Sequence, residues 1–295
     1  MKYLIQLITL FALVFTVNTA LARGGHNPPP APEPNLMNVI TVSAENGDYT
    51  NPVEALNSIP DTNVDQYLII VGPGVYEVSS AIHMKEGVTI QGAGQESTII
   101  TGDVSTSFAN EFSAIVKGAN NSALTDLTII NRGGGTYSIA IFNSRASPRI
   151  ERVTAIAMGE GGYANTGVLN ENYSSPIMTN VTASASSEGA TTETFGVYNV
   201  IGSSPTMVNV KSNASGGSWR NSSVYIADSS PFIVESVLDG SPGLMLDFDS
   251  SGSRIVNNKI IGGVYGALLS VTPTSGSVCR GNYDENLTNV DCPTP

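Results

Sequence analysis

Two similar segments form a repeat in this chain, TGVLNENYSSPIMTNV at residues 166–181 and FGVYNVIGSSPTMVNV at residues 195–210. Both copies contain a Ser-Pro turn, and that turn recurs at intervals of 28, 29 and 26 residues, with its proline at Pro148, Pro176, Pro205 and Pro231. Weaker copies extend the series in both directions. Repeats with a period of roughly 20 to 50 residues indicate a solenoid or a propeller.

Alignment on the proline places residues of one kind in columns. The first column is apolar and consists of Leu124, Ile150, Met178, Met207, Ile233 and Ile255. Two residues later comes a polar column, where we expect the chain to bend toward solvent or to stack amides: Asp126, Arg152, Asn180, Asn209, Glu235 and Asn257. A second apolar column consists of Ile141, Val168, Val197, Val224, Met245 and Leu268.

These columns predict an all-β fold, a right-handed single-stranded parallel β-helix with three sheets and eight or nine coils. The repeat is too short for a propeller blade of about 40 to 45 residues, and its Gly, Ser and Asn turns lie between short apolar segments. Each strand would pair with its counterpart one coil later, about 4.8 Å away. The two apolar columns would then form continuous lines of core side chains.

One segment predicts a short helix at the N-terminal end of the solenoid. Asn51 is a helix cap by type, Pro52 suits the first helical position, and Val53, Leu56 and Ile59 share one face. We expect this helix to cap the open end of the coil stack.

The chain organisation is expected to be a signal peptide at residues 1–22, a Pro-rich tether at 23–35 and one β-helix domain at 36–295. The first segment has one basic residue, an apolar run and an Ala-Leu-Ala end. Export predicts a secreted protein, extracellular or periplasmic, with no membrane span once the signal is removed. In that oxidising setting Cys279 and Cys292 are expected to form a disulfide; two free thiols or a metal site are the alternatives.

The charge balance limits the partners. The chain has 13 Lys and Arg against 25 Asp and Glu, a net charge of −12. Nucleic acid and anionic membranes are therefore poor partners, and a polyanionic glycan would need calcium to bridge it. Polysaccharide or a cell-surface glycan is the expected partner. No motif indicates a cofactor, so none is predicted, and calcium stays open.

A resemblance to known proteins lies in the segments YLIIVGPGVYEV (67–78) and GVTIQGAGQESTIITG (87–102). They resemble the opening coils of right-handed parallel β-helix proteins of the pectate lyase and pectin methylesterase type. The resemblance implies the pectin lyase-like fold and a carbohydrate substrate. The catalytic aspartates of pectin methylesterases lie in Gln-Asp-Thr and Asp-Phe-Ile-Phe-Gly contexts that this chain does not match, so the fold is predicted without the family's catalytic motifs.

Three aspartates are candidates for general acid and base chemistry: Asp247, Asp249 and Asp126. Strand alternation places Asp247 and Asp249 on one face, about 6.8 Å apart along the strand, which fits the carboxylate spacing of about 6.5 to 9.5 Å in inverting glycosidases. The alternative for Asp247 is a turn-capping role in the column of Asn143, Asn170 and Asn199.

Aromatic side chains are the candidates for ligand binding. Phe142, Tyr198 and Tyr225 are neighbours of the second apolar column, so alternation sends them to the opposite face. They form either an exposed strip able to stack on sugar rings or an internal, partly covered stack. Tyr163 and Trp219 occupy similar places in Gly- and Ser-rich loops and are further candidates for carbohydrate contacts.

The preferred interpretation of the sequence is a non-catalytic secreted protein that binds glycan through a sheet face and its loops. The alternative is a carbohydrate-active enzyme of the pectin lyase-like type: a polysaccharide lyase, a pectinesterase or a glycoside hydrolase. A structural spacer or adhesin is the second alternative.

Overall fold

The computed structural model describes residues 38–62, 65–160, 162–187, 193–247, 250, 252–266 and 278–290. The predicted signal peptide and tether lie outside the described residues, as do Asp249, Leu268 and Cys292. Among the described residues, no helix is long and apolar enough to cross a membrane.

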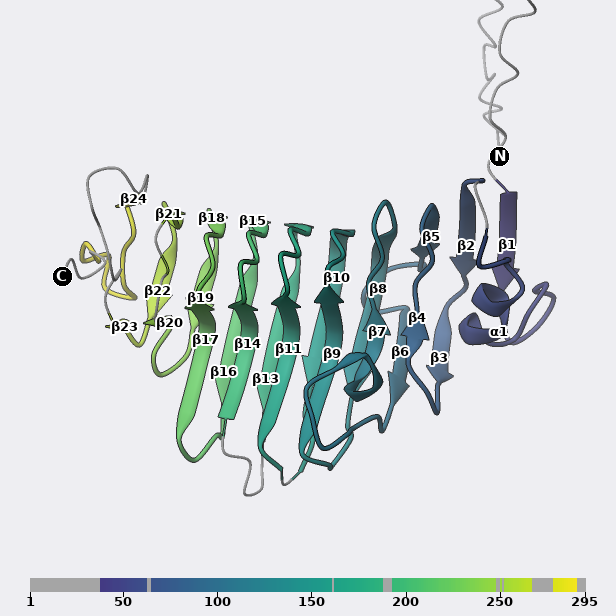
Figure 1. Ribbon diagram of the computed structural model, residues 1–295, viewed down its shortest axis with the longest axis horizontal. Helices are drawn as coiled ribbons and strands as arrows, with labels where there is room; N and C mark the ends of the chain where they lie inside the picture. The colour runs from purple at the N-terminus through teal and green to yellow at the C-terminus, as the bar shows by residue number, and fades with distance from the viewer. Residues whose placement is uncertain are drawn as a thin grey trace, which may run out of the picture. The chain divides into compact units, whose positions relative to one another are not determined.

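The fold is a parallel β-solenoid, as predicted, in which successive coils lie side by side along one row (Figure 1). Three strand faces run along the row. The first face consists of β1 (Asn38–Val42), β2 (Tyr67–Val71), β5 (Val88–Gln91), the beginnings of β8 (Ala123–Asn131) and β10 (Arg149–Ala157), β12 (Ile177–Thr179), β15 (Thr206–Val208), β18 (Phe232–Val234), β21 (Arg254–Val256) and β24 (Val278–Arg280).

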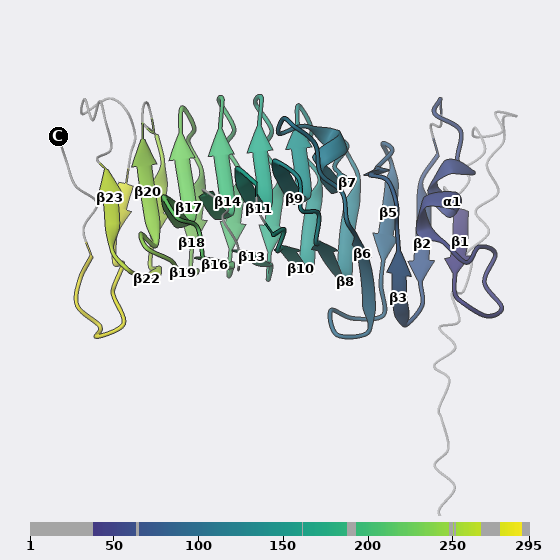
Figure 2. The same cartoon turned by 90° about the horizontal axis from the view of Figure 1, so that it is seen from below.

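The other two faces complete each coil. The second face consists of β3 (Gly74–Glu77), β6 (Thr98–Gly102), the ends of β8 and β10, β13 (Thr182–Ser186), β16 (Lys211–Ser215), β19 (Val237–Asp239) and β22 (Lys259–Ile261). The third face consists of β4 (Ile82–His83), β7 (Ala114–Lys117), β9 (Tyr137–Ser144), β11 (Ala164–Glu171), β14 (Glu193–Val200), β17 (Arg220–Ala227), β20 (Leu244–Asp247) and β23 (Val264–Gly266). Its strands from β7 to β23 lie side by side in Figure 2.

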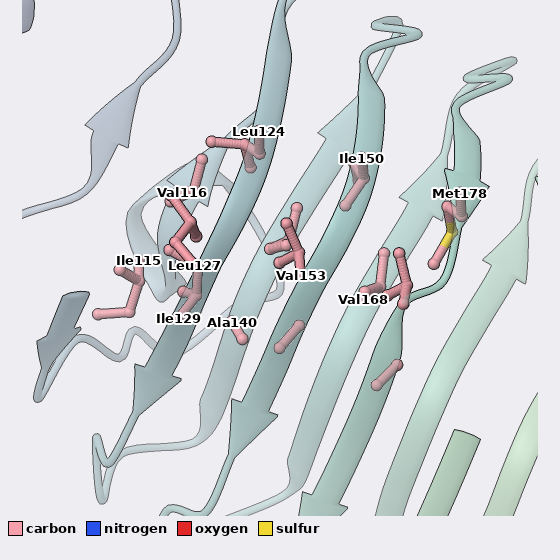
Figure 3. Packing of buried hydrophobic residues seen from close by; sticks show 14 of the residues in the cluster. Ile115, Val116, Leu124, Leu127, Ile129, Ala140, Ile150, Val153, Val168 and Met178 are labelled. Carbon is pink, nitrogen blue, oxygen red and sulfur yellow. The ribbon is translucent and has the colours of Figure 1, made fainter. Parts of the chain in front are cut away.

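The first apolar column is a core line. All six predicted residues are at most 1% exposed, and register pairs each one with the next, for example Ile150 with Met178 and Met178 with Met207. Figure 3 shows Leu124, Ile150 and Met178 one coil apart inside the solenoid. The line ends at Cys279, which pairs with Ile255. The disulfide stays a prediction, because Cys292 lies outside the described residues.

The second apolar column is confirmed through Val224 and is wrong at Met245, while Leu268 lies outside the described residues. Val224 pairs with Leu244, while Met245 pairs with Tyr225. The step from Val224 to its partner is therefore 20 residues, one fewer than the alignment assumed. A one-residue shift in a strand moves a side chain to the opposite face, so Leu244 points inward and Met245 outward.

The polar column forms the bend between the first and second faces. All six residues have positive φ, between 51° and 58°, a left-handed conformation that is costly for most side chains. Neighbouring members of the column bind each other: Asn209 Nδ2 donates to Asn180 Oδ1 at 2.6 Å, and Arg152 binds Asp126. The bend thus turns toward solvent and stacks its amides, as expected.

The predicted helix is also present, as α1 (Pro52–Asn57). The side chain of Asn51 accepts a hydrogen bond from Val53 N at 2.7 Å, and Pro52 occupies the first turn. Leu56 and Ile59 are buried. The helix lies at the β1 end of the row (Figure 1), where it covers the end of the coil stack.

The polar column generates a stability prediction. Glu235 adopts φ 53° without the local hydrogen bonding that makes asparagine tolerant of this conformation. We expect Glu235→Asn to raise the free energy of unfolding by about 1 kcal/mol, and Asn209→Val to lower it by about 1 to 2 kcal/mol. Urea denaturation of the three proteins measures both changes. An unchanged midpoint for both variants would show that the bend does not constrain its residues.

Candidate functional site

The third face departs from strict strand alternation at one position in several of its strands, including β9 and β14. In β9, Ala140 and Ile141 are consecutive and both belong to the main core. In β14 the corresponding residues are Gly196 and Val197, and a Cβ on Gly196 would lie 2.7 Å from the backbone oxygen of Ser223. Two successive residues point inward, so the residues on either side of this pair both point outward.

This kink brings Phe195 to the outer face beside the predicted strip. Phe195 stacks on Tyr198, with ring centroids 4.6 Å apart, and lies 5.4 Å from Tyr225. Tyr198 and Tyr225 meet edge to face at 4.8 Å. Phe142 belongs to the neighbouring outer cluster with Leu169. The strip therefore lies on the outer face but is largely covered, since Phe142 is 2% and Tyr225 is 3% exposed.

A cleft of about 560 Å³ lies over these aromatic side chains. One wall includes Ala109, from the loop between β6 and β7 that crosses in front of β9 (Figure 1). Buried Asn131 fixes the base of this loop, because its side chain binds the backbone of Val104 through both Oδ1 and Nδ2. The lining residues that carry the chemistry are Tyr137, Tyr163, Glu171, Glu193, Tyr198, Arg220, Tyr225, Asp228 and Asp247.

A carboxylate and a guanidinium meet where β14 and β17 begin. Glu193 and Arg220 are register partners on adjacent coils, and Arg220 Nε lies 3.2 Å from Glu193 Oε1. Glu193 is 5% exposed, and its Oε1 makes no hydrogen bond of good geometry. Burial raises the pKa of Glu193 above the ordinary 4.5, while the charge of Arg220 and a hydrogen bond from Tyr163 oppose that rise.

Aromatic rings surround this pair. Arg220 lies 3.9 Å from the ring centroid of Trp219 and 5.9 Å from that of Tyr225. Trp219 is 62% exposed, so it stands at the rim beside the guanidinium. Tyr163 lines the cleft and contacts Tyr137, with centroids 5.4 Å apart. The two predicted loop aromatics are thus both placed near the Glu193 end of the cleft.

Asp247 lies toward the other end of the strands. It pairs with Ala227, so it is outside the asparagine column to which the sequence alignment assigned it, because the preceding coil is one residue shorter than assumed. Tyr225 OH donates to Asp247 Oδ2 at 2.8 Å. Burial, and then this hydrogen bond, raise the pKa of Tyr225, and burial raises that of Tyr198 to about 12.

Asp126 is not part of this cleft. It belongs to the bend between the first two faces, where Arg152 Nε and Nη2 bind its two carboxylate oxygens at 2.5 and 2.9 Å. These hydrogen bonds lower the pKa of Asp126. A catalytic role together with Asp247 is thereby unsupported, and Asp249 lies outside the described residues.

Sequence reasoning missed Glu193, Arg220, Glu171 and Phe195. A signal for the first two existed: they begin corresponding strands, 27 residues apart, and so stand in one column of the repeat. Phe195 was missed because strict alternation points it inward.

Within the part of the chain that the structure describes, no group of three or more His, Cys, Asp or Glu side chains is placed to hold a metal ion. The prediction that the protein uses no cofactor, with calcium open, stays a prediction.

Two comparisons of the sequence with known proteins match pectinesterases. Residues 38–147 match the family model described as Pectinesterase. Pectinesterase 3 of Solanum lycopersicum is 32% identical over 136 residues, which is 46% of this chain and 22% of the tomato protein. The chain thus spans about a fifth of the length of that relative.

Similar solved structures include the rice weevil pectin methyl esterase, with 13% identity, a TM-score of 0.49, and coverage of 88% of this chain and 92% of that one. The pectin methylesterase of Yersinia enterocolitica has 17% identity and a TM-score of 0.48, and the alignment covers 74% of this chain and 81% of the Yersinia chain. Likeness at these levels says nothing about activity.

The sequence match corrects the preferred interpretation of the sequence. A non-catalytic glycan-binding protein is contradicted by the match to the pectinesterase model and to the tomato pectinesterase. The alternative of a carbohydrate-active enzyme of the pectin lyase-like type is better supported, and among its three options the carbohydrate esterase is the one favoured.

Proposed function

We propose that this protein is a carbohydrate esterase that hydrolyses methyl esters of a pectin-type polysaccharide in the cleft on its third face. The observation that carries the proposal is the match of residues 38–147 to the pectinesterase model. The matched segment includes Ala109, Tyr137 and Ile139, which line the cleft. The remaining groups come from the coils that follow.

Glu193 is the general base in this proposal. Its carboxylate is buried, lines the cleft and has a raised pKa, and a raised pKa makes a carboxylate a stronger base. Glu193 takes a proton from water as the water oxygen attacks the ester carbonyl carbon. When the bond from that carbon to the methoxy oxygen breaks, protonated Glu193 returns the proton to the leaving methoxide. The products are methanol and a free uronic acid.

Arg220 stabilises the charge that develops during this reaction. Attack on the carbonyl places negative charge on its oxygen, and a fixed cation near that oxygen lowers the barrier. Arginine has five N–H donors, so the guanidinium can hold Glu193 through Nε and donate to the substrate as well. Contact with Trp219 on one side keeps the guanidinium plane in place.

The aromatic side chains supply the binding surface for the sugars. Tyr163, Tyr198 and Tyr225 line the cleft, and aromatic rings pack well against the apolar faces of sugar rings. We also propose that the protein carries the predicted signal peptide and is secreted, which agrees with a polysaccharide substrate outside the cell. Trp219, at the rim, would contact a sugar outside the reacting position.

Replacement of the base tests the activity directly. We expect Glu193→Gln to reduce methanol release from methyl-esterified polygalacturonate by about 10²- to 10⁴-fold, the usual contribution of a general base. Asp126→Asn is the matched control, since Asp126 lies outside the cleft, and it should release methanol at the wild-type rate. Unsaturated products would indicate a lyase instead, and new reducing ends a hydrolase. Full activity of Glu193→Gln would contradict the assignment of the base.

The pH dependence of the reaction gives a second test. The base must be ionised, so kcat/KM falls as the pH drops through the raised pKa of Glu193. The acid limb should therefore lie above pH 4.5, the ordinary glutamate value. Arg220 opposes the rise, so Arg220→Gln should move the limb to still higher pH as well as slow the reaction. A limb that stayed in place in Arg220→Gln would show that another group titrates.

A further inference from the structure

A smaller pocket lies at the second face, which does not carry the cleft. Its volume is about 200 Å³, less than the roughly 300 to 1,000 Å³ of pockets that enclose a whole drug-sized ligand. It can therefore hold one sugar ring, or one charged group of a longer chain. The lining residues are Gln95, Asn180, Val181, Thr182, Asn209 and Lys211.

Register brings most of these residues together from two adjacent coils. Thr182 and Lys211 begin β13 and β16 and pair with each other. Asn180 and Asn209 stand in the left-handed bend just before these strands, where Asn209 Nδ2 donates to Asn180 Oδ1. The pocket thus has an amide column on one side and a column of Thr and Lys side chains on the other.

The loop between β5 and β6 supplies the remaining wall. Gln95 Nε2 donates to Thr154 Oγ1 at 3.0 Å, and Thr128 Oγ1 donates to the backbone oxygen of Gln95 at 2.6 Å. Register pairs Thr128 with Thr154 and Thr154 with Thr182. The loop is therefore fixed over the two coils that precede the pocket, and the column becomes accessible at Thr182.

The pocket has one cation and several hydrogen-bond donors, and no acid is among its lining residues. Lys211 is exposed and forms no ion pair with any described residue. The amides of Asn180 and Asn209 each have two N–H hydrogens, and their mutual bond uses one of the four. Glu96 follows a lining residue along the chain and Glu235 follows one in the bend column, but neither lines the pocket.

A second lysine continues the column beyond the pocket. Lys211 pairs with Val237 and Val237 with Lys259, so the two lysines are two coils apart, about 9.6 Å at 4.8 Å per coil. Lys259 also forms no ion pair within the part of the chain that the structure describes. Asp239 lies on the same face but in another outward column, where it pairs with Asn213. A linear ligand with repeated carboxylates can therefore contact both lysines.

We propose that the pocket around Lys211 binds the carboxylate of a free uronic acid unit of the polysaccharide. A carboxylate accepts a charge-assisted hydrogen bond from an ammonium, roughly twice as strong as a neutral one. The Thr182 hydroxyl and the amide N–H groups can donate to its other lone pairs. A methyl ester is uncharged and forms no such bond with Lys211.

This inference rests on the proposed function, because free uronates are the products of that reaction. It goes further by giving the product a binding site apart from the cleft. The pocket and the cleft share no lining residue. A demethylated stretch held at the second face thus leaves the cleft open to an esterified stretch.

Calorimetry at low salt with unesterified hexagalacturonate tests the pocket. All proteins carry Glu193→Gln, so that the fully methyl-esterified hexamer can be compared without turnover. We expect Lys211→Gln to weaken binding of the free hexamer about tenfold, the loss expected for one charge-assisted hydrogen bond, and to leave binding of the esterified hexamer unchanged. Lys211→Arg keeps the charge and should keep the affinity.

The matched control is Lys117→Gln, which removes the same charge at the third face, where Lys117 lies 3.6 Å from Glu111. It should bind the free hexamer as its parent does. An equal loss in both lysine variants, or no loss in Lys211→Gln, would overturn the pocket as a uronate site.

The inference and the proposed function fail separately. With Glu193 intact, Lys211→Gln should release methanol from the esterified hexamer at the wild-type initial rate, because Lys211 lies outside the cleft. Methanol release without Lys211-dependent binding of the free hexamer would overturn the inference alone. Lys211-dependent binding without methanol release from the wild type would support the uronate site and overturn the esterase.

Discussion

The hydrogen-bonded pairing of each strand with its counterpart one coil away is the constraint on which the rest of this structure depends. Because the strands are parallel and in register, every side chain has a neighbour of the same orientation about 4.8 Å away on each side. A polar residue that turns inward therefore needs a polar neighbour. The asparagines on the third face meet this requirement within their ladder, where Asn143 donates to Asn170 and Asn170 to Asn199, each at 2.9 Å, and all three are fully buried. Only the amide groups at the two ends of the ladder, Asn143 Oδ1 and Asn199 Nδ2, have no hydrogen-bond partner among the described residues.

The same constraint explains how much of the fold the sequence could predict. A residue type that stacks well on itself is repeated in each coil, so the apolar line through Met178 and Met207 and the left-handed bend at Asn180 and Asn209 are both visible as columns. The capping helix was predictable for a different reason, since Asn51 and Pro52 act through local chemistry. Each of these features can be recognised from the order and type of the residues along the chain.

The candidate site was less predictable because it depends on departures from regularity. The coil between Val224 and Leu244 is one residue shorter than the alignment assumed, and this difference moves Asp247 from an inward amide column to the cleft. At Gly196 two successive residues point inward, so Phe195 points outward, against the alternation rule. The length of one coil and the kink of one strand are set by backbone packing. The pattern of residue types therefore does not predict them.

The register also explains why chemistry can develop on an outer face while the core is unchanged. Val197 and Val224 face inward on the strands that begin with Glu193 and Arg220, so substitutions at the outward positions need not disturb the core line. Two outward residues that are register partners on adjacent coils lie within contact distance of each other. A pair of substitutions at such positions can therefore place a carboxylate beside a guanidinium, as at Glu193 and Arg220. The aromatic side chains that cover the face then bury the pair, and burial raises the pKa of Glu193. The reactivity assigned to this carboxylate thus follows from two properties of the stack: a register that fixes its partner, and a covered outer face that removes water from it.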